Sequence, residues 1–321
     1  MQREGSPWQG LGTVTLKELA DHFGSVRMLL LALLMVVSAA VPLYSAIQQL
    51  RTTTAEDPFL LLRLFNPSGQ ALSVASILGF VVPVMAIGFG FDAISGEHNR
   101  RTLSRILAQP IYRDALLMGK FLAGMIVLAV SLTCLWLLVV GLGLYLLGVP
   151  PSGEEFMRSF VFLVIAVAYA GVWLALAMLF SVLFRSPATS ALLSLGVWLF
   201  MTLLWAMIAP FVAQLIAPPD LRYIVLGVMD PQTQAWEDAL SRISPYLVFE
   251  DAVRTILSPT TPSLGPLLDQ IRQLQGVVVG AALPLVESLQ IAWPQIVALI
   301  AGAIMLFVAT YVVFQRQEVR A

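Results

Sequence analysis

The sequence predicts an all-α membrane protein that crosses the bilayer six times. The first observation is composition, because 59% of the 321 residues are hydrophobic and only 12% are charged. Soluble domains average about 45–50% apolar and about 25% charged residues. The second observation is a set of six long uncharged runs, and the third is the placement of Lys and Arg in the short segments between them.

Each uncharged run is long enough for a helix that spans the membrane. Crossing the hydrocarbon core of roughly 30 Å takes about 20 apolar residues. An even number of spans places both termini on the same side. The runs are 28–50, 71–91, 121–149, 159–184, 188–216 and 288–315.

The distribution of basic residues sets the predicted orientation. Short cytoplasmic loops carry the excess of Lys and Arg. The loop 92–120 has five of them and the loop after the fourth run has Arg185, so this side and both termini are predicted to be cytoplasmic, in the cell (inner) membrane. That side then carries 11 Lys and Arg against 7 Asp and Glu, and the other side carries 7 against 12. Side charges of +4 and −5 do not suit a nucleic-acid binder, which needs a strongly basic face.

The N-terminal segment 1–26 is predicted to contain an interfacial helix. Thr15 and Glu18 have the spacing of a capping box, which marks a helix start. An amphipathic helix next to a span can lie in the headgroup region; a plain cytosolic helix is the alternative. The apolar face would consist of Leu16, Leu19, Ala20 and Phe23, with Lys17, Glu18 and Asp21 in water.

The segment 217–287 is predicted to be an external helical insertion before the last span. It contains eight acidic residues and four arginines, and frequent prolines interrupt it. Short amphipathic helices are predicted at 236–243 and 247–257, whereas the apolar stretch 276–285 is too short to span. The predicted organisation is therefore 1–26, then spans one to five in 27–216 with the cytoplasmic loop 92–120, then 217–287, then the last span and C-terminus in 288–321.

The sequence predicts no catalytic residue, metal site or cofactor in this chain. Cys134 is the only cysteine, and neither His22 nor His98 has metal-ligand spacing with another candidate ligand. The pattern Gly-x-x-x-x-Gly-Lys-Ser/Thr, which cradles nucleotide phosphates, does not occur. If ATP drives this protein, a separate subunit must bind it.

The loop 92–120 has the pattern of an organised structure. Leu103, Ile106 and Leu107 have helical spacing, and Pro110 would end that short amphipathic helix. A partner could dock there, or its basic residues could act only as topology signals near anionic lipid. Asp92 begins the loop, either as a functional carboxylate or, as we favour, at the interface, solvated or paired with Arg100 or Lys120.

Five short motifs follow one another along this loop, between the second and third spans. They are Ser95-Gly96-Glu97, Thr102-Leu103, Ile106-Leu107, Pro110-Ile111-Tyr112-Arg113 and Gly119-Lys120. Their order, together with the six spans and the insertion before the last span, resembles the permease subunits of ATP-binding-cassette type-2 transporters. Arg101 stands where that family often has glycine.

The resemblance implies that the loop couples to a cytosolic ATPase subunit, which binds ATP. It also implies a second permease chain, in a homodimer or heterodimer, and external helices that form a gate. The coupling residues implied are Glu97, Arg100, Arg101, Thr102, Leu103, Leu107, Pro110, Tyr112 and Arg113.

The function predicted is the permease subunit of an ATP-driven exporter of this type. One alternative is a membrane subunit that transmits force to an external partner without moving a soluble substrate. Another is a polytopic membrane enzyme, which the scarcity of ionisable residues in the spans disfavours. The substrate and the residues that bind it stay open: lipids, hydrophobic drugs, peptides, small ions and polysaccharides all fit the sequence.

Overall fold

The computed structural model describes residues 10–52, 59–66, 73–99, 113–148, 150–226, 229–258 and 283–316. All the regular structure in these ranges is helical, and six helices are long and apolar enough to cross a membrane. The predicted fold class is therefore confirmed.

The six spans begin and end close to the predicted runs, and most extend into the charged residues that flank them. The helices extend past the apolar runs because backbone N–H and C=O groups within the membrane must be paired inside the helix. The charged side chains at the helix ends can extend to the polar headgroups. The fifth span is built from three consecutive helical segments. The spans are α2 (Val26–Thr52), α4 (Val74–Gly90), α7 (Arg113–Leu147), α8 (Gly153–Leu183), α9 (Pro187–Leu199) with η1 (Phe200–Leu204) and α10 (Trp205–Ile216), and α15 (Leu285–Arg316).

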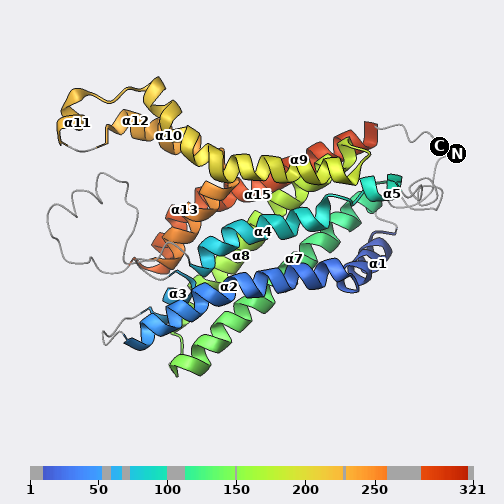
Figure 1. The fold of residues 1–321 in the computed structure, drawn as a ribbon, viewed down its shortest axis with the longest axis horizontal. Helices are drawn as coiled ribbons and strands as arrows, with labels where there is room; N and C mark the ends of the chain where they lie inside the picture. The colour runs from blue at the N-terminus through green and yellow to red at the C-terminus, as the bar shows by residue number, and fades with distance from the viewer. Residues whose placement is uncertain are drawn as a thin grey trace.

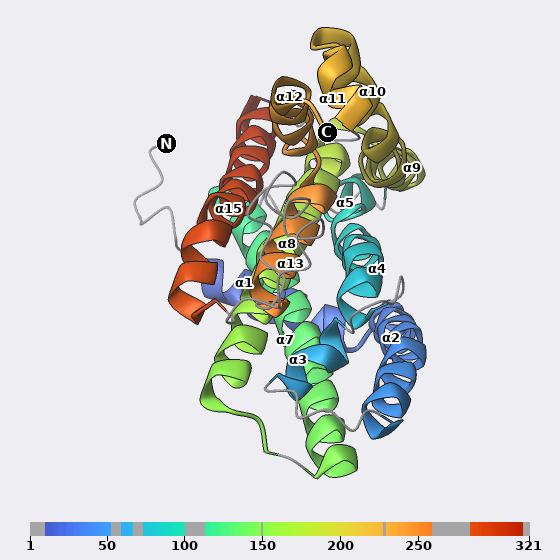
Figure 2. The same ribbon diagram turned by 90° about the vertical axis from the view of Figure 1, so that its left-hand side faces the viewer.

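Helix α8 lies at the centre of the bundle and packs against α4, α7 and α15 (Figures 1 and 2). Tyr169 and Trp173 of α8 are fully buried, and Tyr169 stacks on Phe249 with ring centroids 4.4 Å apart. By contrast, α2, α9, α10 and α15 expose long apolar faces. Such faces are normal where lipid, instead of water, is the solvent.

Helix α1 (Leu11–Phe23) begins earlier than the sequence predicted. Gly10, with φ of 91°, precedes the first turn, and Thr15 lies inside the helix, where its hydroxyl donates a hydrogen bond to the carbonyl of Leu11 at 2.8 Å. The predicted capping box was therefore wrong, because a residue within the helix has no orphan N–H groups to cap. Leu16 and Phe23 of the predicted apolar face are exposed, and α1 packs against α7 through Val14.

Four further helices lie at the opposite end of the bundle from α1 (Figure 1): α3 (Leu60–Phe65), α11 (Leu221–Leu226), α12 (Pro231–Ser241) and α13 (Pro245–Leu257). The last two confirm the short helices predicted in the insertion. Both begin at an Asp or Ser cap followed by proline, a strong start signal. Of the apolar stretch 276–285, residues 276–282 lie outside the described residues, and Leu285 begins α15.

The corner between α12 and α13 is tied to the middle of the fifth span. The hydroxyl of Ser244 donates a hydrogen bond to the carbonyl of Met201, within the π-helical turn η1, at 2.8 Å. One turn further on, the indole nitrogen of Trp205 donates to the carbonyl of Leu240 at 2.9 Å. A π turn disturbs the regular ladder of a helix and often marks a functional position. Here two hydrogen bonds hold the π turn to the corner between α12 and α13.

Arg158 of α8 is completely buried at this opposite end. Its guanidinium donates to the Glu154 carboxylate at 2.8 and 3.0 Å, to the Ile256 carbonyl at 3.0 Å and to the Ser288 hydroxyl at 3.1 Å, and also to the carbonyl of Leu283. These contacts join α8 to α13 and to the start of α15. We call this group of residues the Arg158 hub.

Candidate ATPase-coupling site

The two described ends of the loop 92–120 lie together at the end of the bundle that carries α1 and α5 (Ser95–Asn99) (Figure 1). Helix α4 ends at Gly90 and passes through a short turn into α5, and α7 begins at Arg113. We call the described residues on both sides of the gap, together with those of α1 and α2 that contact them, the loop root.

Lys120 is the centre of the loop root. Its ammonium lies 2.6 Å from a carboxylate oxygen of Glu97 on α5 and 3.0 Å from one of Glu18 on α1. The Lys120 side chain is only 6% exposed, and those of Glu18 and Glu97 are 12% and 14% exposed. Groups removed from water to this degree need good pairing to offset their lost hydration. One lysine therefore joins α1, α5 and α7, although Glu18 lies 102 positions away from it in the sequence.

Gly119 explains how α1 comes close enough to reach Lys120. A Cβ atom at this position would lie 2.7 Å from a methyl carbon of Val14. Real side-chain carbons do not approach that closely, so α1 packs directly on the backbone of α7 here. The pair Gly119-Lys120 has a physical reason in this fold: the glycine admits α1, and the lysine pairs with it.

The charges on α1 favour this pairing. Burial alone would raise the pKa of Glu18, but Lys120 and Lys17 outweigh that effect and lower it. Glu18 is therefore ionised at neutral pH. Lys17 and Asp21 form an exposed pair at 2.9 Å. The sequence prediction that Glu18 lies in water was wrong, because Lys120 holds it against the protein.

Asp92 forms a second ionic contact at the loop root. Both its oxygens accept hydrogen bonds from Arg27 at the start of α2, at 2.7 and 2.8 Å, and Arg27 also donates to the Gly88 carbonyl at 3.0 Å. Lys120, one of the two partners considered for Asp92, is instead held by two glutamates, and the other, Arg100, lies outside the described residues. A bidentate contact of this kind fixes the relative orientation of the two side chains as well as pairing their charges.

The turn between α4 and α5 is also anchored to the central helix α8. The Ser181 hydroxyl oxygen accepts from the backbone N–H groups of Ile94 and Ser95 at 2.9 and 3.0 Å, and all three residues are buried. The Ser95 hydroxyl donates to the carbonyl of Phe91 at 3.1 Å. The start of the loop is thereby fixed to the core of the bundle.

Of the predicted coupling residues, two are described. Glu97 is on α5 and pairs with Lys120, and Arg113 is the half-buried first residue of α7. Next to it, Asp114 accepts a hydrogen bond from the amide of Gln315 near the end of α15. The others, Arg100, Arg101, Thr102, Leu103, Leu107, Pro110 and Tyr112, lie outside the described residues.

Sequence reasoning missed two residues that hold this site. In the sequence, Arg27 is recognisable only as the charged residue before the first span, and Ser181 only as a hydroxyl residue within an apolar run. Their partners are 65 and 86 or 87 positions away, and no local spacing signals a contact at that separation.

The described ranges contain no group of three or more His, Cys, Asp or Glu side chains arranged to hold a metal ion. His22 packs edge-on against Phe89, with ring centroids 5.2 Å apart. Burial lowers the pKa of His22, so the ring is neutral at physiological pH.

These features define a class: an α-helical membrane protein with six spans, in which ion pairs between helices fix both ends of one polar loop. The chain belongs to the ABC-2 family of transporter proteins, whose model matches residues 13–319. The resemblance seen in the loop motifs is thereby confirmed across nearly the whole chain.

Two curated relatives carry the description "Probable ABC transporter permease protein NosY". The one from Stutzerimonas stutzeri is 28% identical over 142 residues, which cover 42% of this chain and 49% of the relative. The one from Pseudomonas aeruginosa is 28% identical over 206 residues, which cover 60% of this chain and 67% of the relative. The matched part thus spans about half of one relative and two thirds of the other.

The family match makes this chain an ABC-2 family transporter protein, and the relatives to which it is similar are described as probable permease proteins. The fold also makes it a multi-pass membrane protein.

Proposed function

We propose that this chain is the permease of an ATP-driven exporter, and that the loop 92–120 receives movement from a cytosolic ATPase subunit. The loop root carries this proposal. Its ion pairs connect the loop to α1, α2 and α7 at once, through Lys120 and Arg27. A push on the loop would reach several helices together.

Rigidity is what coupling needs from the loop root. Elements that transmit movement shift as bodies, because packed cores are not continuously deformable. Ser181 ties the turn before α5 to α8, and Lys120 ties α5 to α7 and α1. Closure of the ATPase subunits would then move the helices joined at the loop root together as one body.

The proposal places the loop root in the cytoplasm and α3, α12 and α13 outside the inner membrane. The excess of Lys and Arg in the loop supports this orientation. It also includes a second permease chain and surrounding lipid, since α2 and the α9–α10 span expose apolar faces suited to either. ATP binds the partner, and the proposal gives this chain no catalytic step.

A second candidate function is force transmission to an external partner. The arm formed by α10, α11 and α12 extends beyond the rest of the bundle (Figure 1), and Thr233 of α12 donates to the carbonyl of Ala217 at 2.7 Å to hold it together. Such an arm could move a partner instead of a substrate. Liposomes containing the complete complex separate the two: ATP-dependent accumulation of a compound supports the exporter.

The test of coupling is purification of the complex through a tag on this chain, with an ATPase assay. Glu97→Gln should weaken ATPase retention or the dependence of hydrolysis on the permease, while membrane insertion stays normal. Arg242→Gln is a matched control, because Arg242 is an exposed charged residue at the other end of the bundle. Equal retention and coupling in both variants would contradict the role given to the loop root.

A further inference from the structure

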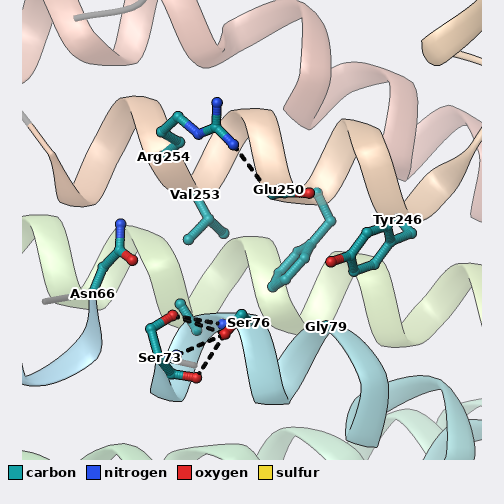
Figure 3. A pocket seen from close by; sticks show the side chains of 10 residues that line it. Asn66, Ser73, Ser76, Gly79, Tyr246, Glu250, Val253 and Arg254 are labelled. Carbon is teal, nitrogen blue, oxygen red and sulfur yellow. Dashed lines mark hydrogen bonds and ion pairs between the residues drawn. The ribbon is translucent and has the colours of Figure 1, made fainter. Parts of the chain in front are cut away.

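A polar pocket lies at the opposite end of the molecule from the loop root. It is about 260 Å³ in volume and is enclosed by the end of α3, the first turns of α4 and one face of α13 (Figure 3). This is close to the lower limit of about 300 Å³ for small-molecule sites. A ligand here would be small.

The floor of the pocket is apolar and fixed. Phe249 and Val253 of α13 are buried, and Phe249 is held by stacking on Tyr169. Gly79 of α4 contributes backbone without a side chain, and a Cβ there would lie 2.9 Å from the ring of Tyr246. The pocket therefore exists partly because position 79 is glycine.

The neutral polar groups of the wall are largely satisfied by each other. Ser73 and Ser76 form a reciprocal capping box at the start of α4, with N–H···O distances of 2.8 and 2.9 Å. Asn66 donates to the Ser258 hydroxyl at 3.1 Å. Burial and the neighbouring Glu250 raise the pKa of Tyr246 to about 12, so its phenol stays protonated. These groups shape the wall and offer single hydrogen bonds.

The charged groups are different, because they are held only loosely. Glu250 and Arg254 pair with each other at 2.9 Å, one helical turn apart on α13, and their side chains are 41% and 59% exposed (Figure 3). An exposed pair of this kind contributes only about 0–1 kcal/mol. Exchanging it for two equivalent pairs with a ligand therefore costs little. The lining carries one positive and one negative charge, which a ligand of zero net charge with separated charges would match.

We propose that this pocket binds a small zwitterion, with its anionic group on Arg254 and its ammonium on Glu250. The same chemistry occurs in a free solute and in the head of a phosphatidylethanolamine lipid. The inference rests on the proposed function only for the side of the membrane, which would make this an external site. Binding itself does not depend on ATPase coupling.

The test uses the full chain with its ATPase partner in nanodiscs of phosphatidylglycerol. Radiolabelled glycerophosphoethanolamine is the probe, and glycerophosphoglycerol, which lacks the ammonium, is the matched competitor. We expect saturable binding of one probe per chain and at least tenfold weaker binding of the competitor. Glu250→Gln and Arg254→Gln should each weaken probe binding at least tenfold, and Arg242→Gln should leave it unchanged.

A second arm identifies the lipid source. Native mass spectrometry of the complex from membranes containing phosphatidylethanolamine should show that lipid retained on the wild type and lost from Arg254→Gln, if the lipid is the ligand. Gly79→Ala narrows the pocket without changing its charge, and should weaken either form of binding several-fold. Binding in neither arm, or binding that ignores Glu250→Gln and Arg254→Gln, overturns the proposal. Failed ATPase coupling with normal probe binding would instead contradict only the proposed function.

Discussion

The loop root and the Arg158 hub lie at opposite ends of the bundle, and each contains a buried cation. The two cations differ in the groups that accept their hydrogen bonds. Lys120 is held by two carboxylates that come from two other helices. Arg158 pairs with one carboxylate, that of Glu154 on its own helix. Its other acceptors are the main-chain carbonyls of Ile256 on α13 and of Leu283, and the hydroxyl of Ser288 on α15.

This difference indicates which end of the molecule is sensitive to pH and to the substitution of single side chains. Main-chain carbonyls do not titrate and are kept when a side chain is substituted, so the contacts of Arg158 with Ile256 and Leu283 do not depend on the charge of a partner side chain. The contacts of Lys120 depend on the charge of side chains alone, so they respond to protonation and to single substitutions. A contact that responds in this way is suited to the end at which we propose that the ATPase subunit docks.

Removing the buried cation of the hub should have the largest effect. We expect Arg158→Met to lower the free energy of unfolding by about 3–5 kcal/mol, because it leaves buried acceptors without donors. Thermal unfolding of the detergent-purified chain measures this. Arg254→Met, which removes an exposed arginine of α13, is the control and should change stability by no more than about 1 kcal/mol, the most expected from its exposed ion pair with Glu250. Similar losses of stability in both variants would show that the buried contacts of Arg158 stabilise the fold no more than those of an exposed arginine.

Lys120→Met should cost somewhat less, about 2–4 kcal/mol, because Glu18 and Glu97 keep slight access to water. It leaves two partly buried carboxylates close to each other, and only the exposed Lys17 remains to pair with Glu18. Adding Glu97→Gln to Lys120→Met should restore part of the loss, since the two residues are coupled. The same unfolding assay measures both variants. Strictly additive losses would mean that the ion pair does not hold α5 to α7.

Gly119→Ala should cost about 1–3 kcal/mol, as overpacking does in a close contact. The new methyl group would lie against Val14, and α1 must shift away from α7. Val14→Ala combined with Gly119→Ala removes the clash and should recover most of the stability. A single mutant as stable as the wild type would show that α1 does not pack on α7 at this point.

Acid should weaken the attachment of α1, with the smallest effect of the four. The pKa of Glu18 is lowered in the folded state, so its stabilisation is complete above its ordinary value of 4.5 and is lost as pH falls through the folded value. His22, also with a lowered pKa, adds a loss that begins below pH 6.5, because the unfolded chain then binds more protons.

The measurement is the unfolding temperature from about pH 7 to about pH 2 for the wild type, Glu18→Gln and His22→Phe. Each variant should lose less stability on acidification than the wild type, His22→Phe in the higher part of the range. Parallel curves for all three would assign the pH dependence to other groups.

The comparison of the two ends also shows how far the sequence could predict this protein. The six spans follow from uncharged length, because lipid imposes one simple requirement on every helix that crosses it. The short helices before the last span follow from their caps and prolines. Glu97, Arg113 and Lys120 could be singled out because their motifs are local and ordered.

Composition and local pattern thus determined the fold class, the spans and the position of the polar loop. Only the tertiary structure decided the partners: Arg27 for Asp92, Glu18 and Glu97 for Lys120, and Gly119 as the seat of α1. It also decided that Arg158 is buried and that a pocket opens above Gly79. The physical reason is that hydrophobic length acts on each helix separately, whereas an ion pair or a close approach requires two distant segments to meet.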